Sequence, residues 1–412
     1  MHAVIPEFHR RPLFTAALLV LGLGLASCSL IGSRPVSPPP APAPVNVVPP
    51  APVAPPLAEP IDTHQFVLTG AEDDLVGAVQ ITRASKEDTL PDIARRFNVG
   101  YEEIVRANPG VDPWLPGAGR RVVVPTQFVL PDAPRVGIVI NVAAMRLYYF
   151  PPHRKGEPQR VFTHPIGIGK VGWSTPEGVT VVVSHKKDPV WRPSVALRRD
   201  HLSDSGEDLP AVVMPGPDNP LGKYEFTLGW PSYLIHGTNK PYGVGLRSSH
   251  GCIRLYPEDI EKLYEMVPNG TPVRVVNQPF LFGWHDNQLY LQAYTVLEDD
   301  ARDGNKTQKK PLPHALAAHI QSALKSKGST LDWDSVAAIA HEPRGVPVSV
   351  SGEGGNVDLV LAAAPEVQNR IPDGANWNGE DDTGTDGKSA QQLLSERESP
   401  SVPAPATPAP RG

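Results

Sequence analysis

The most informative stretch of the sequence is Ser248-Ser249-His250-Gly251-Cys252-Ile253-Arg254-Leu255, preceded by Ile235-His236-Gly237-Thr238. If the chain is extended from His250 to Leu255, successive side chains alternate between two faces. His250, Cys252 and Arg254 then share one face, while the apolar residues between them point into a core. A cysteine between a histidine and an arginine lies in a positive environment, which favours the thiolate. We therefore expect an active-site strand here.

The residues around this strand predict a mainly β fold. Short strand-like runs separated by Gly and Pro turns occur at residues 136–140, 146–150, 178–183, 233–235 and 271–276. Many such strands indicate a β-sandwich or barrel-like catalytic domain over 134–278. One prominent helix is expected from Pro257 to Met266, because proline opens it and acidic residues follow at its N-terminus.

If Cys252 is a nucleophile, it needs further catalytic groups around it. A nucleophile requires a base within hydrogen-bond reach, and its leaving group requires an acid. His236 and His250 are the two local histidines. Gly251, next to Cys252, lets a substrate carbonyl approach the backbone closely, as a pocket of N–H donors for an oxyanion demands.

A second compact unit is expected over 79–127. Its order is strand, helix, helix and strand, and Thr89 with Asp92 forms a capping-box-like start to the first helix. Together with Asn108-Pro109, this pattern resembles a LysM domain, a family that binds glycans such as peptidoglycan. Glu87 departs from the family, which usually has glycine before its Asp-Thr pair. The alternative is a small helical spacer without a ligand.

The N-terminus predicts export. Residues 1–27 read as a lipoprotein signal peptide, with an apolar run from Leu13 to Ala26. Leu25-Ala26-Ser27-Cys28 resembles a lipobox, which implies lipidation of Cys28 and a membrane anchor. The alternatives are an ordinary signal peptide or an uncleaved anchor. Residues 28–64 are Pro-rich and predict a semi-rigid tether. The expected location is periplasmic, with the outer membrane favoured by Ser29.

The C-terminal part divides into two further segments. A hairpin and a helix, the latter at 314–324, are expected within 279–341, and an acidic disordered tail within 342–412. That tail has five Lys/Arg against eleven Asp/Glu, so it accounts for the formal net charge of -6. The rest of the chain is near neutral, which argues against nucleic acid as a partner. The only two cysteines, Cys28 and Cys252, could form a disulfide, but each has a better separate explanation.

The His-Gly-Thr and Ser-His-Gly-Cys-Ile-Arg-Leu motifs resemble the signature of the YkuD-type L,D-transpeptidase family. The likeness is greatest to the proteobacterial branch that includes the Braun-lipoprotein-attaching enzymes. It implies that Cys252 is the acylated nucleophile and His236 the general acid/base, with its ring oriented by the backbone at Gly237. It also implies that the pocket and oxyanion site are shaped by Ser249, His250, Gly251 and Arg254. Tyr233 is also expected in this pocket.

The resemblance implies a reaction on peptidoglycan tetrapeptide stems. Cys252 attacks the carbonyl at the L-centre of diaminopimelate, D-alanine departs, and the thioester waits for an acceptor. An amine of a second stem gives a 3→3 cross-link, a lipoprotein lysine gives a wall-attached protein, and water gives carboxypeptidase activity. No metal or organic cofactor is needed.

Several alternatives stay open at this point. His236, His250 and Cys252 could be zinc ligands, or Cys252 could be a buried inert thiol. A cysteine endopeptidase of the NlpC/P60 type also pairs with LysM modules, although its cysteine precedes its histidine. A glycan-binding lipoprotein with an inactive catalytic domain is the alternative from another class. His164, His185 and His201 match no part of the motif and are expected to be surface or structural residues.

Overall fold

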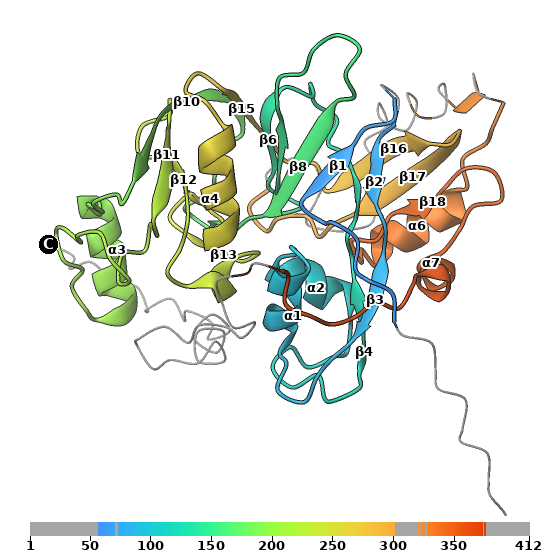
Figure 1. Cartoon of the computed structure of the whole chain (residues 1–412), viewed down its shortest axis with the longest axis horizontal. Coiled ribbons are helices and arrows are strands. Elements are labelled where there is room, and N and C mark those ends of the chain that lie inside the picture. The colour runs from blue at the N-terminus through green and yellow to red at the C-terminus, as the bar shows by residue number, and fades with distance from the viewer. Residues whose placement is uncertain are drawn as a thin grey trace, which may run out of the picture. The chain divides into compact units, whose positions relative to one another are not determined.

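The computed structural model describes residues 57–70, 73–300, 320, 324–325, 328–373 and 375. Its main feature is a nine-stranded sheet that curls into a half-barrel, in the order β1-β8-β7-β6-β15-β10-β11-β12-β14 (Figure 1). The mainly β fold expected from the sequence is confirmed. In chain order its strands are β1 (Gln65–Val67), β6 (Gly137–Asn141), β7 (Arg146–Phe150), β8 (Arg160–Pro165), β10 (Gly178–Lys187), β11 (Tyr224–Leu228), β12 (Leu234–His236), β14 (Ile253–Arg254) and β15 (Pro272–Val276).

The core of this sheet forms because alternate strand residues are apolar. Ile138 and Ile140 of β6 and Val273 and Val275 of β15 pack in one buried cluster. Helix α4 (Pro257–Met266) lies against β11 and adds Leu263 to that cluster. The helix has the bounds expected from its opening proline. It follows β14 directly, so it holds the end of the motif strand against the core.

The second unit has the expected strand–helix–helix–strand order. It consists of the antiparallel pair β3 (Gln80–Arg83) and β4 (Arg121–Val124) with α1 (Leu90–Arg96) and α2 (Tyr101–Ala107) between them. The capping box is present, since Thr89 Oγ1 accepts from Asp92 N and an Asp92 carboxylate oxygen accepts from Thr89 N. Its core gathers the apolar faces of both helices and β4, including Leu90, Ile93, Phe97, Ile104 and Val122.

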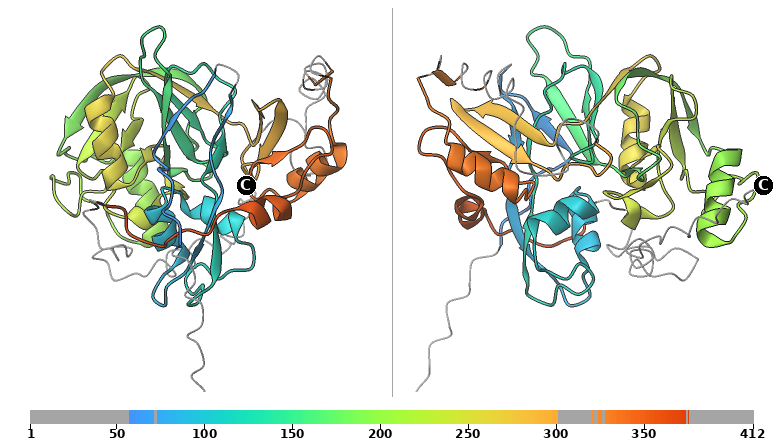
Figure 2. Two further views of the ribbon diagram at one scale, coloured as in Figure 1. Left: turned by 45° about the vertical axis from the view of Figure 1, so that its right-hand side comes forward. Right: turned by 180° about the vertical axis from the view of Figure 1, so that it is seen from behind.

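Two further small sheets lie outside the nine-stranded sheet. The hairpin of β16 (Phe280–His285) and β17 (Gln288–Ala293) pairs with β18 (Val348–Ser349), and β2 (Leu75–Gly77) pairs with β5 (Gln127–Val129). Helix α6 (Trp333–His341) lies along this hairpin, and α7 (Val357–Ala363) follows β18 (Figure 2).

The expectation of disorder from residue 342 onward is wrong for residues 342–373. Val348 packs with Leu289 and Leu291 of the hairpin, while Val346 and Leu361 pack against Ile81. Few apolar residues are needed here, because each completes a core built by earlier segments. The expected helix at 314–324 lies outside the described residues apart from Ile320 and Leu324, and so does the chain after 375.

The packed chain also begins earlier than the expected end of the tether at residue 64. Thr63 is buried, and its carbonyl accepts from Asn98 Nδ2 at 2.7 Å. Ile61 N donates to Gln80 Oε1 at 3.0 Å. The signal peptide and Cys28 lie outside the described residues. Within the described ranges, no helix has the length and apolar character to span a bilayer.

Candidate active site

Two parallel strands bring the motif residues together. β12 and β14 pair so that Ile235 lies beside Ile253 and His236 beside Arg254. Both isoleucines are fully buried in the half-barrel core. Because side chains alternate along a strand, His236 and Arg254 project from the opposite face.

The ring of His236 is buried and held by the backbone. Its Nδ1 lies 2.6 Å from the carbonyl oxygen of Gly237. A carbonyl only accepts, so Nδ1 carries the ring proton in this contact and the lone pair of the neutral ring is on Nε2. Burial, with the Arg254 charge acting in the same direction, lowers the pKa of His236 to about 3. His236 is therefore a neutral imidazole at physiological pH.

Cys252 is half-buried and unpaired with any other cysteine of the described chain. Its thiol donates to the carbonyl of Ser232 at 3.7 Å. Burial raises the pKa of the Cys252 thiol, although the Arg254 charge acts to lower it. The expected preference for the thiolate is thus wrong, because the loss of hydration outweighs the nearby positive charge.

The segment around Cys252 is not a regular strand, contrary to expectation. Gly251 has a φ of +100°, and a Cβ there would come within 2.8 Å of the Tyr233 ring. This close approach brings Tyr233 against the loop that carries Cys252. It also breaks the simple alternation expected from His250 to Leu255, since a left-handed residue redirects the chain.

Two hydroxyl groups hold this loop. Ser249 Oγ donates to the Cys252 carbonyl at 2.6 Å and accepts from Gly251 N at 3.2 Å. Thr175 Oγ1 donates to the Gly251 carbonyl at 2.9 Å. The Gly251 N–H is therefore used within the loop, and Ser249 shapes the loop from inside. Ser249 was expected at the pocket, whereas Thr175 lies far from the motif in sequence and was missed.

His250 contacts a helix that the sequence did not predict. Its Nε2 lies 2.7 Å from Asp200 Oδ2 on α3 (Val195–Ser205), and its ring meets the edge of Trp173. Lys170 Nζ lies 2.8 Å from carboxylate oxygens of both Asp200 and Asp204. The Lys170 ammonium holds the pKa of Asp200 at about 2. Helix α3 buries no residue, so no apolar stripe marks it in the sequence.

Arg254 completes the charged side of the site. Its Nη1 donates to Ser248 Oγ at 3.3 Å, whereas its Nε is shielded from solvent and has no hydrogen-bond partner in the protein. The guanidinium charge lies beside the buried ring of His236 and acts to lower its pKa. Among the described residues, no group of three His, Cys, Asp or Glu side chains is arranged to hold a metal ion, so the zinc alternative finds no support in the geometry.

Cys252 directly precedes β14, and β14 pairs with β12, the strand that carries the buried, backbone-oriented His236. A thiol and an imidazole carried by neighbouring strands are the groups that a cysteine acyltransferase uses. Residues 135–275 match the L,D-transpeptidase catalytic domain known as YkuD, and residues 84–125 match the LysM domain. The chain belongs to the L,D-transpeptidase family, and is an enzyme of that family with an added LysM domain.

The relatives support this membership over most of their length. The chain is 39% identical over 283 residues to the probable L,D-transpeptidase ErfK/SrfK of Salmonella typhimurium, covering 67% of this chain and 88% of that protein. It is 36% identical over 302 residues to the probable L,D-transpeptidase YcfS of Escherichia coli, covering 71% and 90%. It is 45% identical over 227 residues to the probable L,D-transpeptidase YbiS of Escherichia coli, covering 54% and 72%.

Proposed function

We propose that this L,D-transpeptidase acylates Cys252 with a peptidoglycan tetrapeptide and transfers the acyl group to an amine. The observation that supports the proposal is the pair of neutral groups, a Cys252 thiol and a His236 imidazole whose proton is on Nδ1 and whose lone pair is on Nε2. A neutral base and a neutral thiol on neighbouring strands are suited to proton transfer during attack, rather than to a preformed ion pair.

The steps follow from these protonation states. As Sγ of Cys252 attacks the carbonyl at the L-centre of diaminopimelate, Nε2 of His236 takes the thiol proton. The resulting imidazolium gives that proton to the amine of D-alanine when the peptide bond breaks, leaving a thioester. An acceptor amine then attacks the thioester, loses its proton to His236, and releases the thiol.

Three acceptors could complete the proposed reaction by taking the acyl group from Cys252. An amine of a second stem would form a 3→3 cross-link, whereas the terminal lysine of a lipoprotein would become attached to the wall. Hydrolysis would instead make the enzyme a carboxypeptidase.

We also propose a periplasmic location with a lipid anchor at Cys28, preferably in the outer membrane. Support comes from the lipobox-like Leu25-Ala26-Ser27-Cys28 and from the Pro-rich segment that follows it. Such an anchor and tether would hold the enzyme within reach of peptidoglycan, the ligand that the LysM and L,D-transpeptidase domains imply.

The test is mass spectrometry of the products after the chain meets disaccharide-tetrapeptide, with and without a peptide that ends in lysine. A Cys252→Ala variant serves as the control. Loss of D-alanine with a stem dimer establishes cross-linking, and a stem–lysine conjugate establishes protein attachment. No loss of D-alanine in either mixture refutes the transferase proposal and favours a binding lipoprotein with an inactive domain.

A further inference from the structure

The LysM domain contacts the chain just before the nucleophile. After β12 the chain passes through a short 3-10 turn (Pro241–Gly243) into β13 (Arg247–Ser249), which leads to Cys252. Between these elements, Val244 O accepts from Tyr101 N at 3.1 Å and Gly245 O accepts from Glu102 N at 3.2 Å. Both donors belong to the first turn of α2, whose N–H groups have no partner within the helix.

This contact is between two backbones. A Cβ on Gly100 would lie 2.8 Å from Gly245 Cα, and a Cβ on Gly245 would lie 2.2 Å from Tyr101 N. Neither neighbour is a flexible side chain, so neither residue can carry a side chain without a shift of the loop or of α2. The two glycines therefore set how closely the LysM domain approaches the loop before Cys252.

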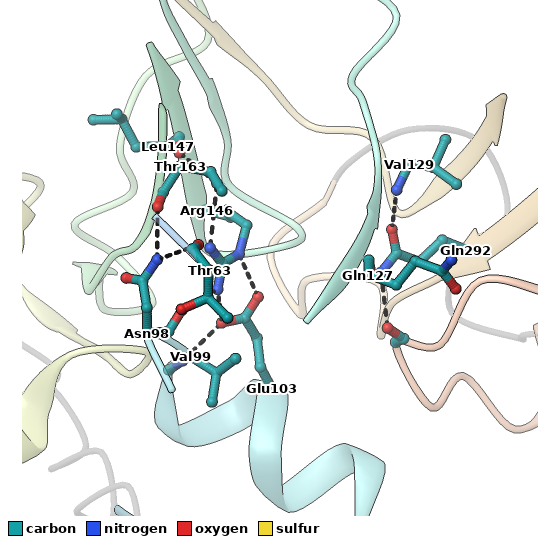
Figure 3. Close-up of polar contacts among 12 residues, drawn as sticks. Thr63, Asn98, Val99, Glu103, Gln127, Val129, Arg146, Leu147, Thr163 and Gln292 are labelled. Carbon is teal, nitrogen blue, oxygen red and sulfur yellow. Dashed lines mark hydrogen bonds and ion pairs between the residues drawn. The ribbon is translucent and has the colours of Figure 1, made fainter. Parts of the chain in front are cut away.

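A buried ion pair fixes α2 at this position. Arg146 of β7 donates from Nε to Glu103 Oε1 at 2.7 Å and from Nη2 to Glu103 Oε2 at 2.9 Å (Figure 3). Arg146 Nη2 also donates to the Asn98 carbonyl at 2.8 Å. The same Glu103 Oε2 accepts from Gly100 N at 2.7 Å. A continuous set of bonds thus runs from the half-barrel through Glu103 to the glycine that meets Gly245.

The chain just after the nucleophile is held by the same domain. Tyr256, which precedes α4, donates from its hydroxyl to the Val99 carbonyl at 3.1 Å. Glu258 in the first turn of α4 accepts two hydrogen bonds from Arg95 of α1, each at 2.9 Å. Cys252 therefore lies in a segment whose two ends, at Gly245 and Glu258, both rest on the LysM domain.

We propose that the LysM domain is a positioning element for the segment from Val244 to Glu258, in addition to any role in glycan binding. This inference rests on the proposed function of Cys252. A shift of the segment would move the nucleophile relative to His236, which lies on a strand held by the core. A displacement of about 1 Å at a catalytic centre can cost roughly a hundredfold in rate.

The test compares Gly100→Ala with Gly70→Ala in the full chain. Gly100 has an ordinary extended φ of -91°, so alanine there causes no backbone strain. Its Cβ would lie 2.8 Å from Gly245 Cα and 3.3 Å from Pro165 Cβ, so the contact with Gly245 is the one most affected. Gly70 has no neighbour within 4 Å of an added Cβ and is the matched control. For each variant we would measure the melting temperature, the kcat and KM of D-alanine release, and the rate of Cys252 alkylation by iodoacetamide, read by peptide mass spectrometry.

Gly100→Ala is expected to lower kcat at least about tenfold with little change in KM, and to alter the alkylation rate. Gly70→Ala is expected to match the wild type. A folded Gly100→Ala variant with wild-type kcat and alkylation overturns the inference. If Gly100→Ala does not fold, Glu258→Ala takes its place, with the same expected fall in kcat and altered alkylation rate. Wild-type kcat and alkylation in Glu258→Ala overturn the inference.

The alkylation rate separates this inference from the proposed function. If the wild type releases no D-alanine, the proposed function fails, yet alkylation of Cys252 still reports the geometry of its loop. An altered alkylation rate in Gly100→Ala then supports the positioning role, and an unaltered rate refutes it.

Discussion

Asp200 Oδ2 lies 2.7 Å from Nε2 of His250, so α3 contacts the residue two positions before the nucleophile. The contact is partly exposed, and the same carboxylate also meets Lys170. Exposed ion pairs stabilise a fold by less than about 1 kcal/mol. The contact between Asp200 and His250 therefore acts by orienting the His250 ring and adds little to the stability of the fold.

Asp200→Asn is expected to reduce kcat/KM roughly fivefold to tenfold, below the loss that a full displacement of a catalytic group causes. The melting temperature should change little. Asp204→Asn is the control, because Asp204 also meets Lys170 but is not a partner of His250 in the described contacts. Equal losses of kcat/KM in both variants would mean that the ion pairs with Lys170 matter and that the orientation of His250 does not.

Arg146→Met is expected to destabilise the fold by about 3 to 5 kcal/mol, because it leaves Glu103 buried without its cation. The free energy of unfolding in urea measures this loss. The double variant Glu103→Leu with Arg146→Met should recover part of the stability. A loss below about 1 kcal/mol in the single variant would show that Glu103 finds another partner or is hydrated.

The thiol of Cys252 is expected to titrate above the pKa of a free cysteine, because burial raises its pKa. The rate of iodoacetamide alkylation at Cys252 against pH gives the midpoint. Arg254→Gln removes a charge that lowers this pKa, so it should shift the midpoint further upward. A wild-type midpoint below that of a free thiol would instead indicate a thiolate–imidazolium pair and contradict the neutral pair proposed here.

His236 is expected to make the fold sensitive to acid. Its pKa is lowered to about 3 in the folded protein, so the unfolded chain binds a proton there at a higher pH than the native state does. The resulting stability is fully present above the unfolded value of about 6.5 and declines as the pH falls toward the folded value. The melting temperature of His236→Gln should therefore fall less than that of the wild type when the pH is lowered from 7.5 to 5. An equal loss in both proteins would refute this assignment.

Local signals in the sequence account for much of the fold. The opening proline of α4, the Thr89–Asp92 capping box and the apolar run of β7 each predict an element that the structure contains. The backbone contact of His236 with Gly237 also agrees with the role that the family resemblance implied. These features depend on neighbours within a few residues along the chain, so sequence patterns can reveal them.

Other features depend on residues far apart in the chain. Asp200 and His250 are 50 residues apart, and α3 has no apolar face that would mark its position. The disorder expected after Glu342 is wrong for residues 342–373, because Val346 and Leu361 complete a core with Ile81. Composition describes a segment by itself and does not reveal such distant partners. The raised pKa of Cys252 likewise arises from burial by the whole fold, which the flanking His and Arg do not reveal.

Direct detection of the acyl-enzyme tests whether Cys252 carries the acyl group. The chain would be mixed with disaccharide-tetrapeptide, quenched in acid at short times, and digested for peptide mass spectrometry. We predict a thioester adduct on the peptide that contains Cys252, equal in mass to the substrate less D-alanine, and none in Cys252→Ala. Release of D-alanine without any adduct on Cys252 would contradict the assignment of Cys252 as the nucleophile. Release of D-alanine by the Cys252→Ala variant would contradict it as well.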